Sequence, residues 1–205
     1  MLLLKRLLCV ALAVLCLLSL CACSGEEAQS TNGQKLDILG MELGQIKNYI
    51  EIGKYKGLEV STAENTRDGA IWAAVEGNFS LKEYPEQHVL YYAEQLRVEY
   101  RYYAEQDGKS KDEIDALLEE SEESILAEAR ALTKSDLVYA AIVKLEGISV
   151  TEDEKAALFD RYVEKYVSVY GYGAEYVKQN MADEIYSSML YDKTTEFLLT
   201  NNNVK

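Results

Sequence analysis

Residues 145–154 constrain the fold more than any other stretch, because they join two amphipathic helical segments. Gly147 can adopt the left-handed backbone conformation that ends a helix. Thr151 followed by Glu154 is a capping box, which begins the next helix. The apolar residues before the joint recur at helical spacing: Leu132, Leu137, Val138, Ala141, Ile142 and Leu145. The pattern predicts a long helix, a short apolar hinge and a capped helix.

The residues from 63 onward predict an all-α domain. Helices are expected over 70–75, 85–106, 110–118, 122–147, 152–170 and 174–200, with a turn at 119–123 and a break near Asn180. The helix over 122–147 would span about 39 Å, longer than a compact bundle of this size needs. Trp72, the single tryptophan, is expected in the core. Residues 46–62 alternate loosely and predict an extended segment that packs on the helices.

The first 22 residues predict a signal peptide. Lys5 and Arg6 precede an apolar run that is too short to span a bilayer comfortably. The run ends in Leu20-Cys21-Ala22-Cys23, which resembles a bacterial lipobox with Cys23 as the lipid-bearing first mature residue. An ordinary secretory signal with incidental cysteines is the alternative. Residues 23–45 are small and polar and predict a flexible tether, so we expect a lipid-anchored protein on the extracytoplasmic face of the cell membrane.

Charge and cysteine content narrow the possible functions. Removing residues 1–22 would change the net charge from −14 to −16, and such an acidic chain is unsuited to binding nucleic acid. The other three cysteines lie within residues 1–22, so a lipidated Cys23 would leave no disulfide.

The sequence also offers no catalytic or cofactor site. His88 is the single histidine, is expected at or near the surface, and has no second histidine or cysteine with which to share a metal. No Gly-x-Ser-x-Gly elbow or phosphate-binding glycine loop occurs. We therefore predict a non-enzyme with no cofactor and no small-molecule substrate.

Four stretches of the chain share motifs with one known family: residues 137–154 around the joint, Tyr170-Gly171 followed by Val177, residues 189–199 (MLYDKTTEFLL), and residues 49–60 (YIEIGKYKGLEV). In this order they resemble the trigger factor C-terminal chaperone family, together with the related SurA-like fold. The resemblance covers residues 49–205 and implies an elongated, two-armed helical domain.

Two parts of that family do not match this sequence. The 24 residues between Val60 and Pro85 are too few for the FKBP-type isomerase domain that the family carries there. The ribosome-docking Gly-Phe-Arg-x-Gly-Lys loop is also missing. Isomerase activity and ribosome binding are therefore not expected.

Tyrosine is the residue type that suggests a binding surface. The chain has 16 tyrosines, and tyrosine combines a rigid apolar body with a polar tip that suits adaptable protein contacts. The candidate client-binding residues are Tyr91, Tyr102, Tyr162, Tyr166, Met181 and Met189. Tyr162 and Tyr166 share a helix face with Phe159 and are expected to be largely core.

These observations predict a membrane-anchored chaperone that holds unfolded or newly exported polypeptides without catalysis. The alternative is a lipoprotein adaptor that docks one specific envelope protein. A degenerate isomerase is a third hypothesis, which we disfavour because binding proline alone does not lower the rotation barrier of about 20 kcal/mol.

Overall fold

The computed structural model describes residues 35–62 and 66–205. The predicted signal peptide, Cys23 and the tether up to residue 34 lie outside the described residues. The described chain forms two compact units. Unit 1 consists of residues 35–41, 48–50 and 81–137, and unit 2 consists of residues 42–47, 51–62, 66–80 and 138–205.

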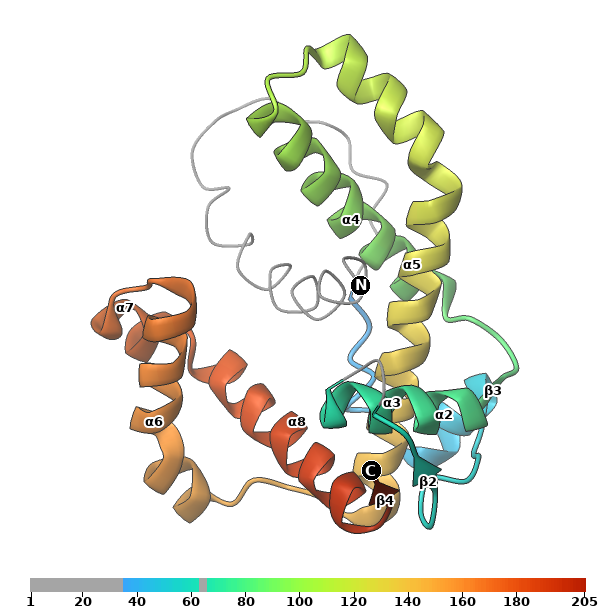
Figure 1. The fold of residues 1–205 in the computed structure, drawn as a ribbon, viewed down its shortest axis with the longest axis vertical. Coiled ribbons are helices and arrows are strands. Elements are labelled where there is room, and N and C mark those ends of the chain that lie inside the picture. The colour runs from blue at the N-terminus through green and yellow to red at the C-terminus, as the bar shows by residue number, and fades with distance from the viewer. Residues whose placement is uncertain (1–34, 63–65) are drawn as a thin grey trace. The chain divides into compact units, whose positions relative to one another are not determined.

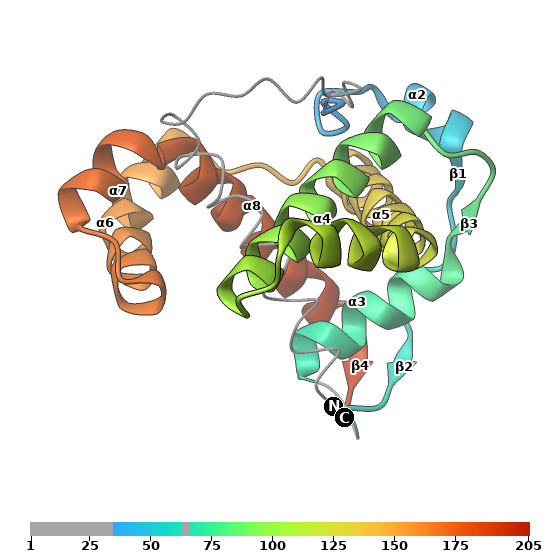
Figure 2. The same ribbon diagram turned by 90° about the horizontal axis from the view of Figure 1, so that it is seen from above.

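Unit 1 is built on a pair of adjacent helices. Helix α4 (Glu86–Gln106) runs beside the first part of helix α5 (Lys111–Glu146) in Figures 1 and 2. The chain turns between them at Gly108, and the Ser110 amide donates a 2.8 Å hydrogen bond to the Glu113 carboxylate at the start of α5. Their shared core consists of Val89, Ala93, Leu96, Ile125 and Ala129.

Unit 2 contains helices α3 (Arg67–Asn78), α6 (Glu152–Tyr170), α7 (Ala174–Asn180) and α8 (Ala182–Thr200), together with residues 138–146 of α5. Helices α6, α7 and α8 share one core: Tyr162, Val163, Tyr166, Val177, Met181, Ile185 and Met189. Helix α3 packs on α8, where the Trp72 indole donates a 2.9 Å hydrogen bond to the Thr195 hydroxyl. Trp72 is buried, which confirms its predicted core position.

Within residues 35–62 and 66–205, four short strands form two sheets. Strand β1 (Ile50–Glu51) pairs with β3 (Ser80–Leu81), and β2 (Glu59–Val60) pairs in parallel with β4 (Asn203–Val204). In the second pair Glu59 lies opposite Asn203 and Val60 opposite Val204.

The Asn202 side chain fastens the second sheet. It accepts a hydrogen bond from the Leu58 amide at 2.8 Å and donates to the carbonyls of Tyr55 at 3.0 Å and Leu198 at 2.7 Å. Asn202 therefore links the end of α8 to the segment that leads into β2.

The predicted joint is confirmed in detail. Gly147 has φ 61°, so it ends α5 in the left-handed conformation. Thr151 caps α6 with the reciprocal capping box that its spacing to Glu154 predicted. The break near Asn180 is confirmed between α7 and α8, and the all-α class is confirmed by the helices as a whole.

Other predicted boundaries were wrong. The turn expected at 119–123 is absent, because α5 continues through it and merges the two helices predicted on either side. Glutamate is a good helix former, so the acidic run interrupts the apolar pattern without breaking the helix. Helix α3 begins at Arg67 and is longer than residues 70–75.

The tether and the extended segment also start differently from the prediction. Helix α2 (Leu43–Tyr49) occupies the end of the predicted tether and the first residues of the segment predicted to be extended. Within the tether, Ile38 is buried. Burying the apolar side chains of Ile38 and Ile46 stabilises this segment against the rest of the protein. The polar composition of the neighbouring residues hid this contribution and led to the prediction of a flexible tether.

Candidate client-binding surfaces

Four of the six predicted client-binding residues lie in the core of unit 2. Tyr162, Tyr166, Met181 and Met189 are all buried among α6, α7 and α8. The Tyr162 hydroxyl donates to Asp192 at 2.7 Å, and the Tyr166 hydroxyl lies 2.8 Å from the Ser188 hydroxyl. Their polar tips are thus paired inside the unit, and these side chains offer no surface to a client. The α6 face that they share with Phe159 is therefore a packing face.

Helix α4 places the other two predicted residues differently. Tyr102 is 45% exposed and pairs edge-on with Tyr103, which is 56% exposed, at a centroid distance of 5.5 Å. We call these two residues the α4 tyrosine pair. The same helix buries Leu96 and Ala104 in unit 1, and Tyr103 lies outside that core. Tyr91 is only half-buried and stacks against His88 at 6.0 Å.

Unit 2 carries an aromatic row of which sequence reasoning selected only Tyr166. The rings of Tyr166, Tyr170, Tyr172 and Tyr176 follow one another at centroid distances of 5.4, 6.2 and 5.7 Å. We call this set the α6–α7 tyrosine row. It leads from the buried Tyr166 to Tyr176, which is 39% exposed. Val169 lies in the same segment with 63% of its surface exposed.

The row exists because α6 ends abruptly. Gly171 has φ 72°, a left-handed conformation in which a residue with a side chain would be strained. The chain then turns through Tyr172 and Gly173 into α7. A helix end that reverses in three residues brings tyrosines of two helices together. The Tyr-Gly-Tyr-Gly run of residues 170–173 was the sequence signal for this arrangement.

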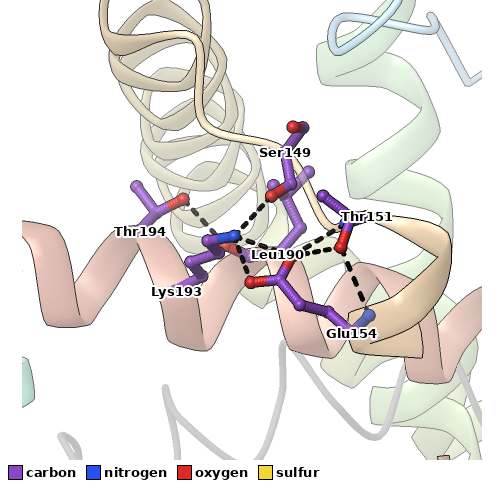
Figure 3. Close-up of polar contacts among 6 residues, drawn as sticks. All are labelled: Ser149, Thr151, Glu154, Leu190, Lys193 and Thr194. Atoms are coloured by element: carbon purple, nitrogen blue, oxygen red, sulfur yellow. Dashed lines mark hydrogen bonds and ion pairs between the residues drawn. The ribbon is translucent and has the colours of Figure 1, made fainter. Parts of the chain in front are cut away.

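A polar cluster fixes the start of α6 on α8. The Lys193 ammonium donates to both oxygens of the Glu154 carboxylate at 2.6 and 2.8 Å and to the Ser149 carbonyl at 2.8 Å (Figure 3). Glu154 also accepts the Thr151 amide at 2.8 Å. Hydrogen bonds from Lys193, followed by that from the Thr151 amide, lower the pKa of the Glu154 carboxyl to about 2. The cluster therefore joins the capping box to α8 and holds the angle at which α6 leaves the joint.

The base of the joint is held separately. Glu146, the last residue of α5, accepts hydrogen bonds from the Tyr55 hydroxyl at 2.6 Å and the Lys56 ammonium at 2.7 Å. The Lys56 ammonium lies over the Phe197 ring of α8 at 5.2 Å. Both sides of the Gly147 turn are thus tied to neighbouring elements of unit 2.

Neither a metal centre nor a membrane span is found where the structure describes the chain. Across residues 35–62 and 66–205, no three His, Cys, Asp or Glu side chains are grouped to hold a metal ion. In the same ranges no helix combines the length and apolar character needed to cross a bilayer. His88, expected near the surface, is instead buried in unit 1.

One comparison with known proteins gives a match. The family profile described as "Bacterial trigger factor protein (TF) C-terminus" matches residues 43–200. The match spans more than half of the chain and contains the joint, the α4 tyrosine pair and the α6–α7 tyrosine row. No curated protein and no solved structure shows a significant match.

Proposed function

The chain belongs to the trigger factor C-terminal family, and from this premise we propose that it is a holdase, a chaperone that binds unfolded or newly exported polypeptides without catalysis. Proteins of this family bind unfolded polypeptide clients. The observation that carries the proposal is the exposure of aromatic side chains in both units, in the α4 tyrosine pair and at the end of the α6–α7 tyrosine row.

The chemistry of these two surfaces suits clients of varied sequence. Tyrosine rings offer apolar contact area at a small cost in conformational entropy, and their hydroxyl groups stay satisfied in water. A client that touches both surfaces would gain avidity, because the second contact becomes intramolecular. Each contact can remain weak, so clients dissociate without an energy source.

We further propose that the protein works at the extracytoplasmic face of the cell membrane, anchored by a lipid on Cys23. The lipobox-like Leu20-Cys21-Ala22-Cys23 motif supports this. Acyl chains contribute about 0.8 kcal/mol per buried methylene, so a multiply acylated cysteine holds a protein firmly. Changing Cys23 to alanine should abolish incorporation of radiolabelled fatty acid and leave the precursor unprocessed. Label that still enters the Cys23→Ala protein would refute the anchor.

Suppression of client aggregation tests the holdase proposal. The full chain should suppress aggregation of several unrelated unfolded proteins at near-stoichiometric ratios. Changing both Tyr102 and Tyr103 to serine should raise the chain concentration needed for half-suppression several-fold, because each lost aromatic contact lowers client occupancy. Changing Val169 and Tyr176 to serine should have a similar effect, and combining the two pairs should have a larger one.

Matched controls separate binding from folding. Gln106 and Gln179 are exposed neighbours of the two surfaces on α4 and α7, so changing both to serine should leave suppression unchanged. Exposed substitutions usually alter stability by no more than about 0.5 kcal/mol, so every variant should keep its helicity. Full activity in the folded tyrosine variants would reject these surfaces. Failure of the unchanged chain to suppress any aggregation would reject the holdase and favour the adaptor.

A further inference from the structure

His88, the single histidine of the chain, lies in unit 1 with only 1% of its surface exposed. Both ring nitrogens have partners. Nδ1 lies 3.1 Å from the backbone nitrogen of Leu36, and Nε2 lies 2.8 Å from Oδ2 of Asp136. The same Asp136 oxygen accepts a 2.6 Å hydrogen bond from the Tyr92 hydroxyl.

These contacts assign the proton of the ring. A backbone N–H can only donate, so Nδ1 must present its lone pair to Leu36. Nε2 therefore carries the hydrogen and donates it to the Asp136 carboxylate. The arrangement requires a neutral imidazole in the Nε2–H tautomer.

The Leu36 contact fastens residues 35–41, which we call the strap. The strap folds into a tight turn, in which Ile38 is buried and the Met41 amide donates to the Ile38 carbonyl at 3.2 Å. The Lys35 ammonium lies 6.0 Å from the centre of the Tyr91 ring, which in turn stacks on His88. His88 thus connects the strap with α4, and through Asp136 with α5.

We propose that His88 is a proton-controlled latch, which holds the strap on unit 1 when the imidazole is neutral and releases it when the imidazole is protonated. Protonation places a hydrogen on Nδ1, so two donors then face each other and the bond from Leu36 is lost. The Nε2–H bond to Asp136 survives, and the carboxylate stabilises the new positive charge.

The groups around the ring support this direction of change. Asp136 faces it from α5, and Tyr91 and Tyr92 face it from α4 itself, while Lys35 of the strap lies over the far neighbour, the Tyr91 ring. Burial, followed by the negative charge of Asp136, raises the pKa of both tyrosines, so their phenols stay neutral. A positive imidazolium beside the strap that carries Lys35 further disfavours the closed arrangement. In proteins, imidazole is the side chain that changes charge between about pH 5 and 8.

Hydrogen–deuterium exchange on the full chain tests the latch. Protection of peptides covering residues 35–41, corrected for the intrinsic pH dependence of exchange, should fall by roughly five-fold or more as the pH is lowered and the imidazole gains its second proton, as expected for losing one hydrogen bond. Peptides from α8 should keep their protection. In His88→Gln, the amide oxygen can accept from Leu36 and the amide nitrogen can donate to Asp136, so the strap should stay protected over the same pH range.

A second variant and a spectroscopic measurement keep the proposal falsifiable if His88→Gln does not fold. Asp136→Asn removes the charge that favours imidazolium, so strap release should move to lower pH. Nitrogen-15 NMR of the imidazole should show the Nε2–H tautomer at pH 8 and two protonated nitrogens at the pH where the strap is released. The latch is overturned by an unchanged strap in the wild type, by equal release in a folded His88→Gln protein, or by an Nδ1–H tautomer at pH 8.

Discussion

Changing the half-buried Asn202 to alanine should destabilise unit 2. The change removes three hydrogen bonds, with the Leu58 amide and with the carbonyls of Tyr55 and Leu198. Each bond contributes about 1 kcal/mol net, and the half-buried site lets water replace part of the loss. We therefore expect a loss of about 2–3 kcal/mol in the free energy of unfolding.

Urea denaturation followed by tryptophan fluorescence measures this loss in the correct unit. Trp72 is the single tryptophan, and it is buried on α3 against α8, where its ring stacks on Tyr191 at 5.4 Å. Its signal therefore reports unit 2 without interference from unit 1. The midpoint should fall while the slope of the transition stays the same, as expected for a change in stability alone.

Asn201 provides the matched control. Among the residues that the structure describes, its side chain has one hydrogen-bond partner, the Phe197 carbonyl, which accepts from Nδ2 at 2.8 Å, and it is exposed. Asn201→Ala should cost about 0.5 kcal/mol. If the midpoints of Asn202→Ala and Asn201→Ala agree within error, Asn202 does not link α8 to the β2 segment in the way that its bonds indicate.

Three further predictions concern the joint and the α4–α5 pair. Gly147→Val should cost about 1 kcal/mol or more in urea unfolding, because valine is strained at φ 61° although no atom obstructs it; unchanged stability would contradict this. Because the pKa of Glu154 is lowered to about 2, its stabilising contribution is present above pH 4.5 and is lost as the pH falls towards 2. Lys193→Met should flatten that loss in an acid titration followed by Trp72 fluorescence. Burial, and then the charge of Glu128, raises the pKa of Glu99, which is 8% exposed and whose Oε2 has no hydrogen-bond partner in the described part of the chain. Unit 1 should therefore become more stable as the pH falls through that raised pKa, and Glu99→Gln should slow the hydrogen exchange of α4 and α5 at pH 7; equal or faster exchange would refute it.

The features that sequence analysis predicted correctly are those encoded within a few residues. Gly147 and the Thr151–Glu154 capping box specify a helix end and a helix start by local backbone chemistry, and both appear as predicted. The acidic run at 119–123 shows the limit of the same approach. Apolar periodicity was interrupted there, but intrinsic helix propensity kept α5 continuous.

The binding surfaces were harder to predict, because exposure depends on partners distant in sequence. Helix periodicity alone does not show that α7 and α8 cover the Tyr162 face of α6, or that the core of unit 1 leaves Tyr103 outside. The position of His88 depends on Asp136, 48 residues away, and on Leu36, 52 residues away. No local pattern encodes such pairings.

The parallel pairing of β2 with β4 has a consequence for the order in which the protein becomes structured. If the protein is exported as we propose, strand β2 cannot pair with β4 until the whole chain between Glu59 and Asn203 has been translated and moved across the membrane. Closing the loop between β2 and β4 lowers the conformational entropy of the chain before the contacts between the strands can stabilise it. A holdase that folds in this order would itself be incompletely folded during export, like the polypeptides that we propose it binds. Neighbouring copies that have already closed their sheets would then be available to bind it.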